Sequence, residues 1–162
     1  MSIVETLYAP VADRACELGC QMPEGIAILP ENFCSAASRQ ALLVRAETTP
    51  LRFLFEDRSF PLESFFRAGE HTTFGHDSGI SWEVSLFVPS AFVERRPDAV
   101  PAALQLISNH LVEFFKGHAG RKVTLSFVVE RKSDRMCRKL TYEGDAAGIV
   151  ALAHHVHEVA RR

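Results

Sequence analysis

The sequence predicts an α+β fold, with a mixed or antiparallel sheet of about four strands and amphipathic helices packed on it. Two observations in the second half of the chain support this prediction. Segments such as Trp82–Val88 and Val123–Glu130 place apolar residues at every second position, as a strand with one well-covered face does. Other segments repeat apolar residues at spacings of three and four, as amphipathic helices do. Their order predicts a β-α-β-β-α unit over residues 80–162.

The N-terminal segment, residues 1–67, is expected to be largely helical. Pro10 suits the first turn of a helix and Gly19 suits its end, so a first helix is predicted between them. A second helix is predicted over about Ser35–Glu47, because its Ala, Gln, Leu and Arg residues favour helix and its apolar residues recur at helical spacing.

Four further segments precede the second half. Leu51–Arg58 is predicted as a short helix with Thr49 as its N-cap, although alternating aromatic residues leave a strand as the alternative. Ile26–Leu29 is a short apolar run that fits either a brief strand or an extended segment on the core. Phe60–Arg67 has the aromatic-rich composition of a strand, and the glycines and polar residues of 68–79 predict a loop.

The second half contains more regular elements. A helix is predicted from Asp98 to Gly117, Arg135–Tyr142 is predicted as a strand after a short turn, and Asp145 can cap a last helix. Each helix has a single apolar stripe, so both are expected to pack on the same face of the sheet. The stripes are Val100, Leu104, Ile107, Leu111 and Phe114 in the first helix, and Ile149, Leu152, Val156 and Val159 in the second.

Length and composition restrict the class of protein. A chain of 162 residues fits one domain, so 1–162 is expected to be a single α+β domain, and a net charge of −2 argues against a general polyanion binder. The N-terminus lacks the pattern of a signal peptide, and the longest run of small apolar residues, Ala146–Ala153, is too short to span a membrane. We therefore expect a soluble, cytoplasmic protein with no membrane contact. The four cysteines are expected to be reduced thiols: Cys16, Cys20, Cys34 and Cys137.

A basic segment follows the second predicted strand. Its cations are Arg131, Lys132, Arg135, Arg138 and Lys139. Such a hairpin tip can bind an acidic protein partner or a phosphate backbone. The alternative is that these side chains protect an exposed sheet edge from unwanted pairing. Nucleic acid is not the expected partner, because the aromatic residues needed for stacking are used in the core.

The histidines of the last helix do not predict a metal site. His154, His155 and His157 are adjacent in sequence, but at about 100° per residue they spread around the helix and at most one pair faces a common point. No cofactor, no metal and no catalytic residue is expected from any motif in the chain. Two alternatives stay open: a small hydrolase or metal-dependent enzyme that uses a cysteine and the loop residues His71, His76 and Asp77, and a ligand sensor with a pocket between the sheet and the N-terminal half.

Two motifs in Val123–Val159 carry a family resemblance. They are Phe127–Glu130 (FVVE) and Leu140–Asp145 (LTYEGD). The segment resembles small effector-associated domains of bacterial conflict and signalling systems, which are built around caspase-like or trypsin-like proteases and nucleotide-dependent scaffolds. Such domains are adaptors without catalytic residues, so the resemblance implies a component of a bacterial defence or signalling system.

Together these observations favour a non-enzymatic protein-interaction or adaptor module. It would recognise a protein partner through the basic segment, or by adding a strand to a sheet edge. The sequence leaves open whether the chain forms a homo-oligomer.

Overall fold

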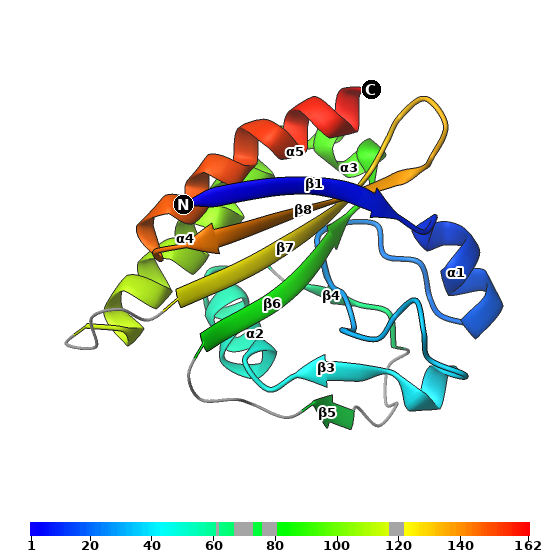
Figure 1. The fold of residues 1–162 in the computed structure, drawn as a ribbon, viewed down its shortest axis with the longest axis horizontal. Coiled ribbons are helices and arrows are strands. Elements are labelled where there is room, and N and C mark those ends of the chain that lie inside the picture. Colours follow the sequence, from blue (N-terminus) through cyan, green and yellow to red (C-terminus); the bar gives the residue numbers. More distant parts are fainter. Residues whose placement is uncertain (61, 67–72, 76–80, 117–121) are drawn as a thin grey trace.

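The computed structural model describes residues 1–60, 62–66, 73–75, 81–116 and 122–162. It confirms the α+β class, with helices around one large mixed sheet and one small sheet (Figure 1). The strands are β1 (Ser2–Tyr8), β2 (Ala27–Ile28), β3 (Leu43–Arg45), β4 (Glu63–Ser64), β5 (Thr73–Gly75), β6 (Ser81–Val88), β7 (Lys122–Glu130) and β8 (Cys137–Gly144). The large sheet has six strands in the order β1-β8-β7-β6-β2-β4, two more than predicted, and β3 pairs with β5.

The centre of the large sheet is the predicted β-α-β-β-α unit. The helices of the protein are α1 (Val11–Leu18), α2 (Thr48–Asp57), α3 (Ser90–Arg95), α4 (Ala99–Phe114) and α5 (Leu152–Arg161), with short 3-10 helices η1 (Arg39–Ala41) and η2 (Ala147–Ala151). Strands β6 and β7 are parallel, and α3 and α4 connect them, as a parallel pair requires. β7 and β8 form an antiparallel hairpin, and β1 pairs antiparallel with β8. One continuous row across the sheet therefore contains Val84, Leu125, Tyr142 and Ile3.

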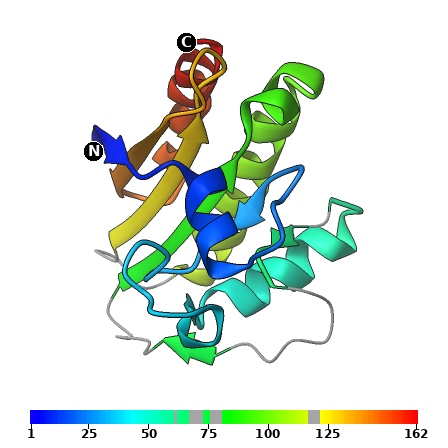
Figure 2. The same ribbon diagram turned by 90° about the vertical axis from the view of Figure 1, so that its right-hand side faces the viewer.

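One face of the sheet carries the main core, which α4 and α5 cover together as predicted. Leu104 and Ile107 of α4, Val156 of α5, and Leu125 and Phe127 of β7 are all fully buried in this cluster. Helix α2 packs beside α4 (Figure 2), so the N-terminal half contributes to the same core. Burying each such apolar side chain contributes about 1.5–3 kcal/mol, which makes this cluster the main source of stability.

The opposite face is covered only in part by the described residues. Helix α1 and the segment that follows it bury Phe87, Val128 and Cys137 near the carboxyl ends of β6 and β7. Phe33 and Phe65 pack there with ring centroids 4.9 Å apart. Away from this second cluster, the same face of the sheet presents hydroxyl and charged residues of β6, β7 and β8.

The predicted second helix, Ser35–Glu47, is wrong. This segment contains only η1 and then β3. The side chain of Asn32 explains the difference, because its Oδ1 accepts from the N–H of Leu43 at 2.7 Å and its Nδ2 donates to the carbonyl of Ala41 at 2.9 Å. Such side-chain bonds satisfy the backbone outside a helix and override a local helix preference.

The other N-terminal predictions were more successful. α1 ends at Gly19 as predicted, with a left-handed φ of 69°. α2 confirms the predicted short helix, but it begins at Thr48, so Thr49 lies within the helix and is not its N-cap. The Ile26–Leu29 run forms β2, whereas Phe60–Arg67 yields only the two-residue strand β4 among its described residues. Helix α3 and the strands β1, β3 and β5 were not predicted, and β5 shows that residues 68–79 are not entirely a loop as expected. Because β1 lies in the N-terminal segment, that segment is less helical than expected.

Candidate interaction site at the sheet edge and the hairpin

The β7–β8 hairpin carries the basic residues singled out in the sequence. Arg131, Lys132 and Arg135 lie in the connection between the strands, and Arg138 and Lys139 lie on β8. The connection forms a loop at one corner of the molecule (Figure 1). Arg135 has a φ of 59°, a left-handed conformation that costs a residue with a side chain about 1–2 kcal/mol.

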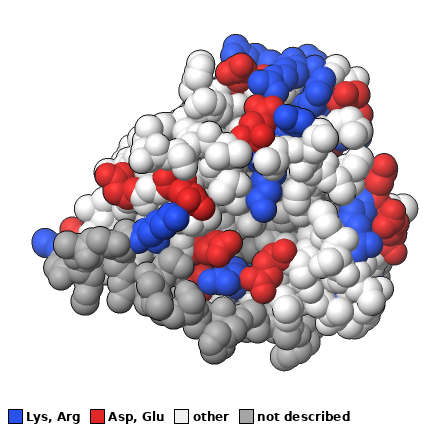
Figure 3. Space-filling view, viewed as in Figure 1, with Lys and Arg blue, Asp and Glu red and all other residues white. Residues whose placement is uncertain are grey.

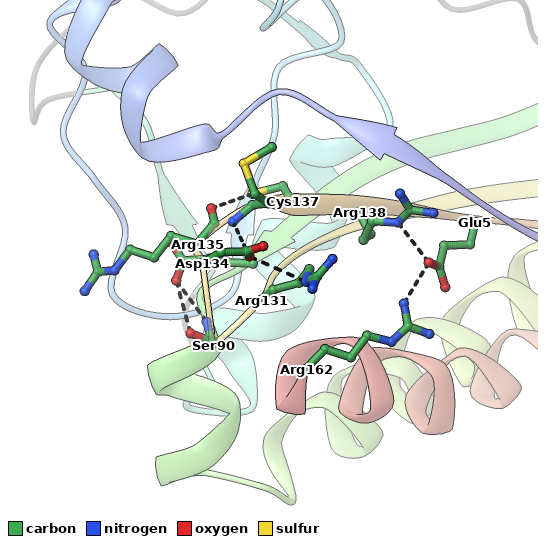
Figure 4. Close-up of polar contacts among 10 residues, drawn as sticks. Glu5, Ser90, Arg131, Asp134, Arg135, Cys137, Arg138 and Arg162 are labelled. Carbon is green, nitrogen blue, oxygen red and sulfur yellow. Dashed lines mark hydrogen bonds and ion pairs between the residues drawn. The ribbon is translucent and has the colours of Figure 1, made fainter.

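Part of the positive charge of the hairpin is neutralised by ion pairs. Arg131 Nε lies 3.5 Å from Asp134 Oδ1, and Lys132 Nζ lies 2.7 Å from Glu94 Oε1 on α3. The exposed side chain of Arg135 extends away from its labelled neighbours (Figure 4). Basic side chains still gather over the hairpin and the C-terminal end of α5, interspersed with acidic ones (Figure 3). The hairpin is therefore a mixed surface with a basic excess rather than a cluster of five free cations.

The interpretation of these side chains as edge protection is wrong. β8 lies inside the sheet, because Leu140 pairs with Phe127 of β7 on one side and with Glu5 of β1 on the other. Arg138 and Lys139 therefore do not lie on an exposed edge. The interpretation from sequence placed the edge at β8 because it did not recognise β1.

The edge of the sheet at this end is β1. It pairs with β8 over seven residues, and no described residue pairs with its outer side. In an antiparallel strand, alternate residues direct their N–H and C=O groups to opposite sides, so about half of these residues present unpaired backbone groups outward. Two of its apolar side chains are also exposed, by 52% at Val4 and by 74% at Leu7.

An ion-pair network holds this edge strand in place. Glu5 Oε2 accepts from Arg138 Nε of β8 and from Arg162 Nη1 at the end of α5, both at 2.8 Å (Figure 4). The hydrogen bond from Arg162 is the main cause that lowers the pKa of Glu5, and Arg138 adds to it against the effect of burial. Arg138 shares its face of β8 with the buried Leu140 and Tyr142, and the pairing with Glu5 balances its charge there.

A cavity of about 500 Å³ opens beside the hairpin. It lies at the carboxyl ends of the parallel strands β6 and β7, where α/β proteins commonly bind ligands. Polar and apolar side chains of α3, α5 and the hairpin line it: Ser90, Val93, Glu94, Pro97, Lys132, His157, Ala160 and Arg161. The buried Glu130, at the end of β7, connects this strand to the start of α3. Its Oε1 accepts hydrogen bonds from the N–H and the hydroxyl of Ser90, each at 3.2 Å. Of the predicted binding residues, the cavity includes Lys132.

Of the residues of the enzyme alternative, the structure describes only the cysteines. His71, His76 and Asp77 lie outside the described residues. Cys137 is buried, and burial is the main cause that raises its pKa to about 11, so it is a poor nucleophile. Among the residues that the structure describes, no group of three His, Cys, Asp or Glu side chains is placed to hold a metal ion.

The three histidines of α5 do not face a common point, as the helical period predicted. His154 is exposed, and its Nε2 lies 3.9 Å from Oε2 of Glu158, one turn along the same helix. His157 instead lines the large cavity. His154 and His155 pack edge to face.

Comparisons with known proteins gave no match, either to a protein-family model, to a curated protein or to a solved structure. The fold and the site must therefore be interpreted from their own geometry. Within the described chain, no helix has both the length and the apolar character needed to cross a bilayer.

The sequence contained a signal for β1. Residues 2–8 (SIVETLY) are rich in β-branched and aromatic residues, contain neither Pro nor Gly, and precede Pro10. The strand was missed because its apolar residues do not alternate regularly. Ile3 and Val4 are adjacent, and the outward Leu7 does not match a one-faced strand.

Proposed function

We propose that this protein is a non-enzymatic interaction module that binds an extended segment of a partner protein by strand addition to the outer edge of β1. The observation that carries the proposal is the unpaired side of β1, a strand of seven residues at the end of a six-stranded sheet. Strand addition obtains its affinity from main-chain hydrogen bonds and its specificity from alternate side chains.

Apart from one inward-facing charge, Glu5, which is paired with Arg138 and Arg162, β1 lacks the usual devices that prevent edge pairing. Proteins commonly protect edges with short strands, Lys or Pro residues, or a covering segment. The strand at the opposite edge of the sheet, β4, has two residues and is protected by its shortness. β1 has seven residues, contains neither Lys nor Pro, and exposes Val4 and Leu7. Its backbone is therefore accessible, and its register is fixed by β8 and by Glu5.

The side chains around β1 favour a partner segment that combines apolar and acidic residues. Val4 offers an apolar contact on one face, and Lys139 lies beside Thr6 on the same face. Arg162 lies next to the other face, where it reaches Glu5. An acidic residue of the added strand on the same face as Val4 and Thr6 would complement Lys139.

A second copy of the chain fits this edge less well. In the fully overlapped antiparallel register of two β1 strands, Glu5 would lie opposite Glu5 of the other copy. Like charges directly opposite each other are destabilising in sheets. The partner is therefore a different protein, and an adaptor role in a bacterial defence or signalling system agrees with the resemblance of Val123–Val159.

The first experiment identifies the partner and the contact together. A photo-crosslinking amino acid replaces the exposed Val4, and a matched variant carries it at the exposed Phe53 of α2. We expect the Val4 probe alone to attach to a distinct protein, through a segment that alternates apolar residues. A crosslink to Val4 of another copy would instead identify a homo-oligomer. Equal crosslinking from both positions would contradict the proposal.

The second experiment tests the backbone contact with a peptide of the crosslinked segment. Thr6→Pro and Leu7→Pro are matched substitutions, because both side chains are exposed and adjacent residues direct their N–H groups to opposite sides. One variant should lose a bond to β8 and become less stable. The other should keep the stability and bind the peptide at least about tenfold more weakly. Unchanged binding by both folded variants would refute strand addition.

The contribution of the hairpin is tested separately by charge reversal. Arg135→Glu should weaken binding and reduce its salt dependence if the partner segment is acidic. Asp134→Lys adds positive charge at the neighbouring position and should strengthen binding. If neither variant changes the affinity, the hairpin does not belong to the site, and the contact is limited to β1.

A further inference from the structure

A small cavity with aromatic walls lies between the start of α2, β6 and the C-terminal end of α4. Its volume is about 170 Å³. The cavity is lined by Ala46, Glu47, Pro50, Trp82, His110 and Phe114. The rings of His110 and Phe114 are stacked, with centroids 6.1 Å apart. Burial lowers the pKa of His110, which favours the neutral imidazole and leaves Glu47 as the charged residue of the lining.

The carboxylate of Glu47 is buried and only half satisfied. Its side chain is 8% exposed. Oε2 accepts from Arg45 Nε at 3.1 Å and from the N–H of Glu83 at 3.4 Å. Oε1 is buried and has no hydrogen-bond partner among the described residues. A buried carboxylate with an unpaired oxygen is costly unless a positive charge lies nearby.

Arg45 does not fully balance the negative charge around this cavity. Its guanidinium also pairs with Glu31, with Nη1 and Oε2 3.5 Å apart. Burial lowers the pKa of Arg45, but the hydrogen bond to Glu47 and the charges of Glu47, Glu83 and Glu31 raise it overall. One cation thus interacts with three carboxylates. Among the described residues this leaves an excess of negative charge beside the cavity, which favours a cationic guest.

We propose that this cavity binds a trimethylammonium group, with its methyl groups against Trp82 and Phe114 and its charge balanced by the carboxylate of Glu47. Aromatic side chains attract cations through their π faces, Trp most strongly, and quaternary ammonium groups are recognised in this way. Such an ion donates no N–H hydrogen bond, so it would stabilise the carboxylate of Glu47 by Coulomb attraction alone. Pockets for drug-sized ligands measure roughly 300–1,000 Å³, so this smaller cavity suits a single head group.

The test uses the single tryptophan of the chain as a local reporter. Trp82 fluorescence is recorded during titration with tetramethylammonium chloride and with choline chloride, against sodium chloride at equal ionic strength. The neutral comparator is 3,3-dimethylbutan-1-ol, which has the shape of choline without its charge. We expect saturable binding of both cations, on the order of tenfold tighter than the neutral comparator. Equal affinity for choline and the comparator, or no saturable change, would overturn the proposal.

Matched variants locate the binding. Glu47→Gln should weaken choline binding on the order of tenfold, whereas Glu31→Gln, which also removes a partner of Arg45 but lies outside the cavity, should not. Phe114→Ala should weaken binding and Phe53→Ala should not, and both side chains are more than half exposed, so these variants should fold. Equal effects within either pair would contradict the assignment.

A final titration distinguishes the two sources of the group. A peptide that carries trimethyl-lysine is compared with choline on the unmodified protein. Tighter binding of the peptide assigns the cavity to a modified protein side chain, and tighter binding of choline assigns it to a small molecule. If neither binds more tightly than the neutral comparator, the cavity does not recognise a trimethylammonium group.

Discussion

Replacement of Glu5 by Gln tests how the edge strand β1 is held on the sheet. The substitution keeps the size of the side chain and removes the charge that attracts Arg138 and Arg162. These two residues belong to β8 and to the end of the chain, so Glu5 connects three segments that are far apart in sequence. We expect Glu5→Gln to reduce the stability of the whole fold and to increase hydrogen exchange along β1.

The expected change in the free energy of unfolding follows from how exposed Glu5 and its two arginine partners are. The side chains of Glu5, Arg138 and Arg162 are 28%, 23% and 38% exposed. Ion pairs in such positions contribute about 0.2–1 kcal/mol each, so Glu5→Gln should lower the free energy of unfolding by about 0.5–2 kcal/mol. For a domain of this size, each 1 kcal/mol corresponds to roughly 2–4 °C in the melting temperature.

The effect should depend on pH in a defined direction. The pKa of Glu5 is lowered in the folded chain from the ordinary value of 4.5, chiefly by the hydrogen bond from Arg162. The folded state therefore binds the Glu5 proton less tightly than the unfolded state does. The stabilisation is complete above the unfolded pKa and is lost as the pH falls through the folded pKa. The difference between the original chain and Glu5→Gln should thus be full at about pH 7 and smaller at about pH 3.

Urea unfolding at both pH values measures this difference, with Glu143→Gln as the control. Glu143 lies on β8 and pairs with Lys122 at 3.0 Å, but both side chains are about half exposed. Its replacement should cost no more than about 0.5 kcal/mol. The explanation fails if Glu5→Gln costs no more than this control, or if its cost is the same at both pH values.

Two further predictions concern the core. Tyr142 is fully buried and its hydroxyl donates to the carbonyl of Asp145 at 2.7 Å, so Tyr142→Phe should lower the free energy of unfolding by about 1–2 kcal/mol in urea titration. If Tyr142→Phe leaves the free energy of unfolding unchanged, this hydrogen bond contributes nothing to stability. Thiol labelling should modify the exposed Cys16 and Cys34 in the folded chain, and Cys137 only after denaturation, because it is buried and its pKa is raised to about 11. Rapid labelling of Cys137 under native conditions would contradict its place in the core.

The sequence predicted the C-terminal unit well because its elements satisfy their own patterns. Leu104, Ile107 and Leu111 face the core at helical spacing, although Phe114, the last residue of the predicted stripe, is 60% exposed. The alternating apolar residues of β7 face the core, and its second half is buried on both faces. Local pattern and tertiary burial agree there, so periodicity was sufficient. In the segment Ser35–Glu47 they disagree. Side-chain bonds from Asn32, just before this segment, hold its backbone outside a helix, and residue composition does not reveal them.

The candidate interaction site shows the same division. The basic hairpin was recognisable from sequence because its five cations are close together in the chain. The sequence did not show which of these cations are paired. The ion pairs with Glu94 and Glu5 form only when segments up to 133 residues apart come together. The identity of the edge strand also depended on long-range pairing. A strand pattern shows that a segment can join a sheet, but not whether it has one neighbour or two.

The sequence by itself therefore determined the α+β class, the two core helices and the order of the central strands, because local periodicity encodes which face of each element is apolar. Only the tertiary structure decided that β1 forms the open edge and that Glu5 joins Arg138 and Arg162. It likewise placed Glu47 beside Trp82 and Phe114. These arrangements join residues distant in sequence, and pairing, burial and charge between such residues arise only when the chain is folded.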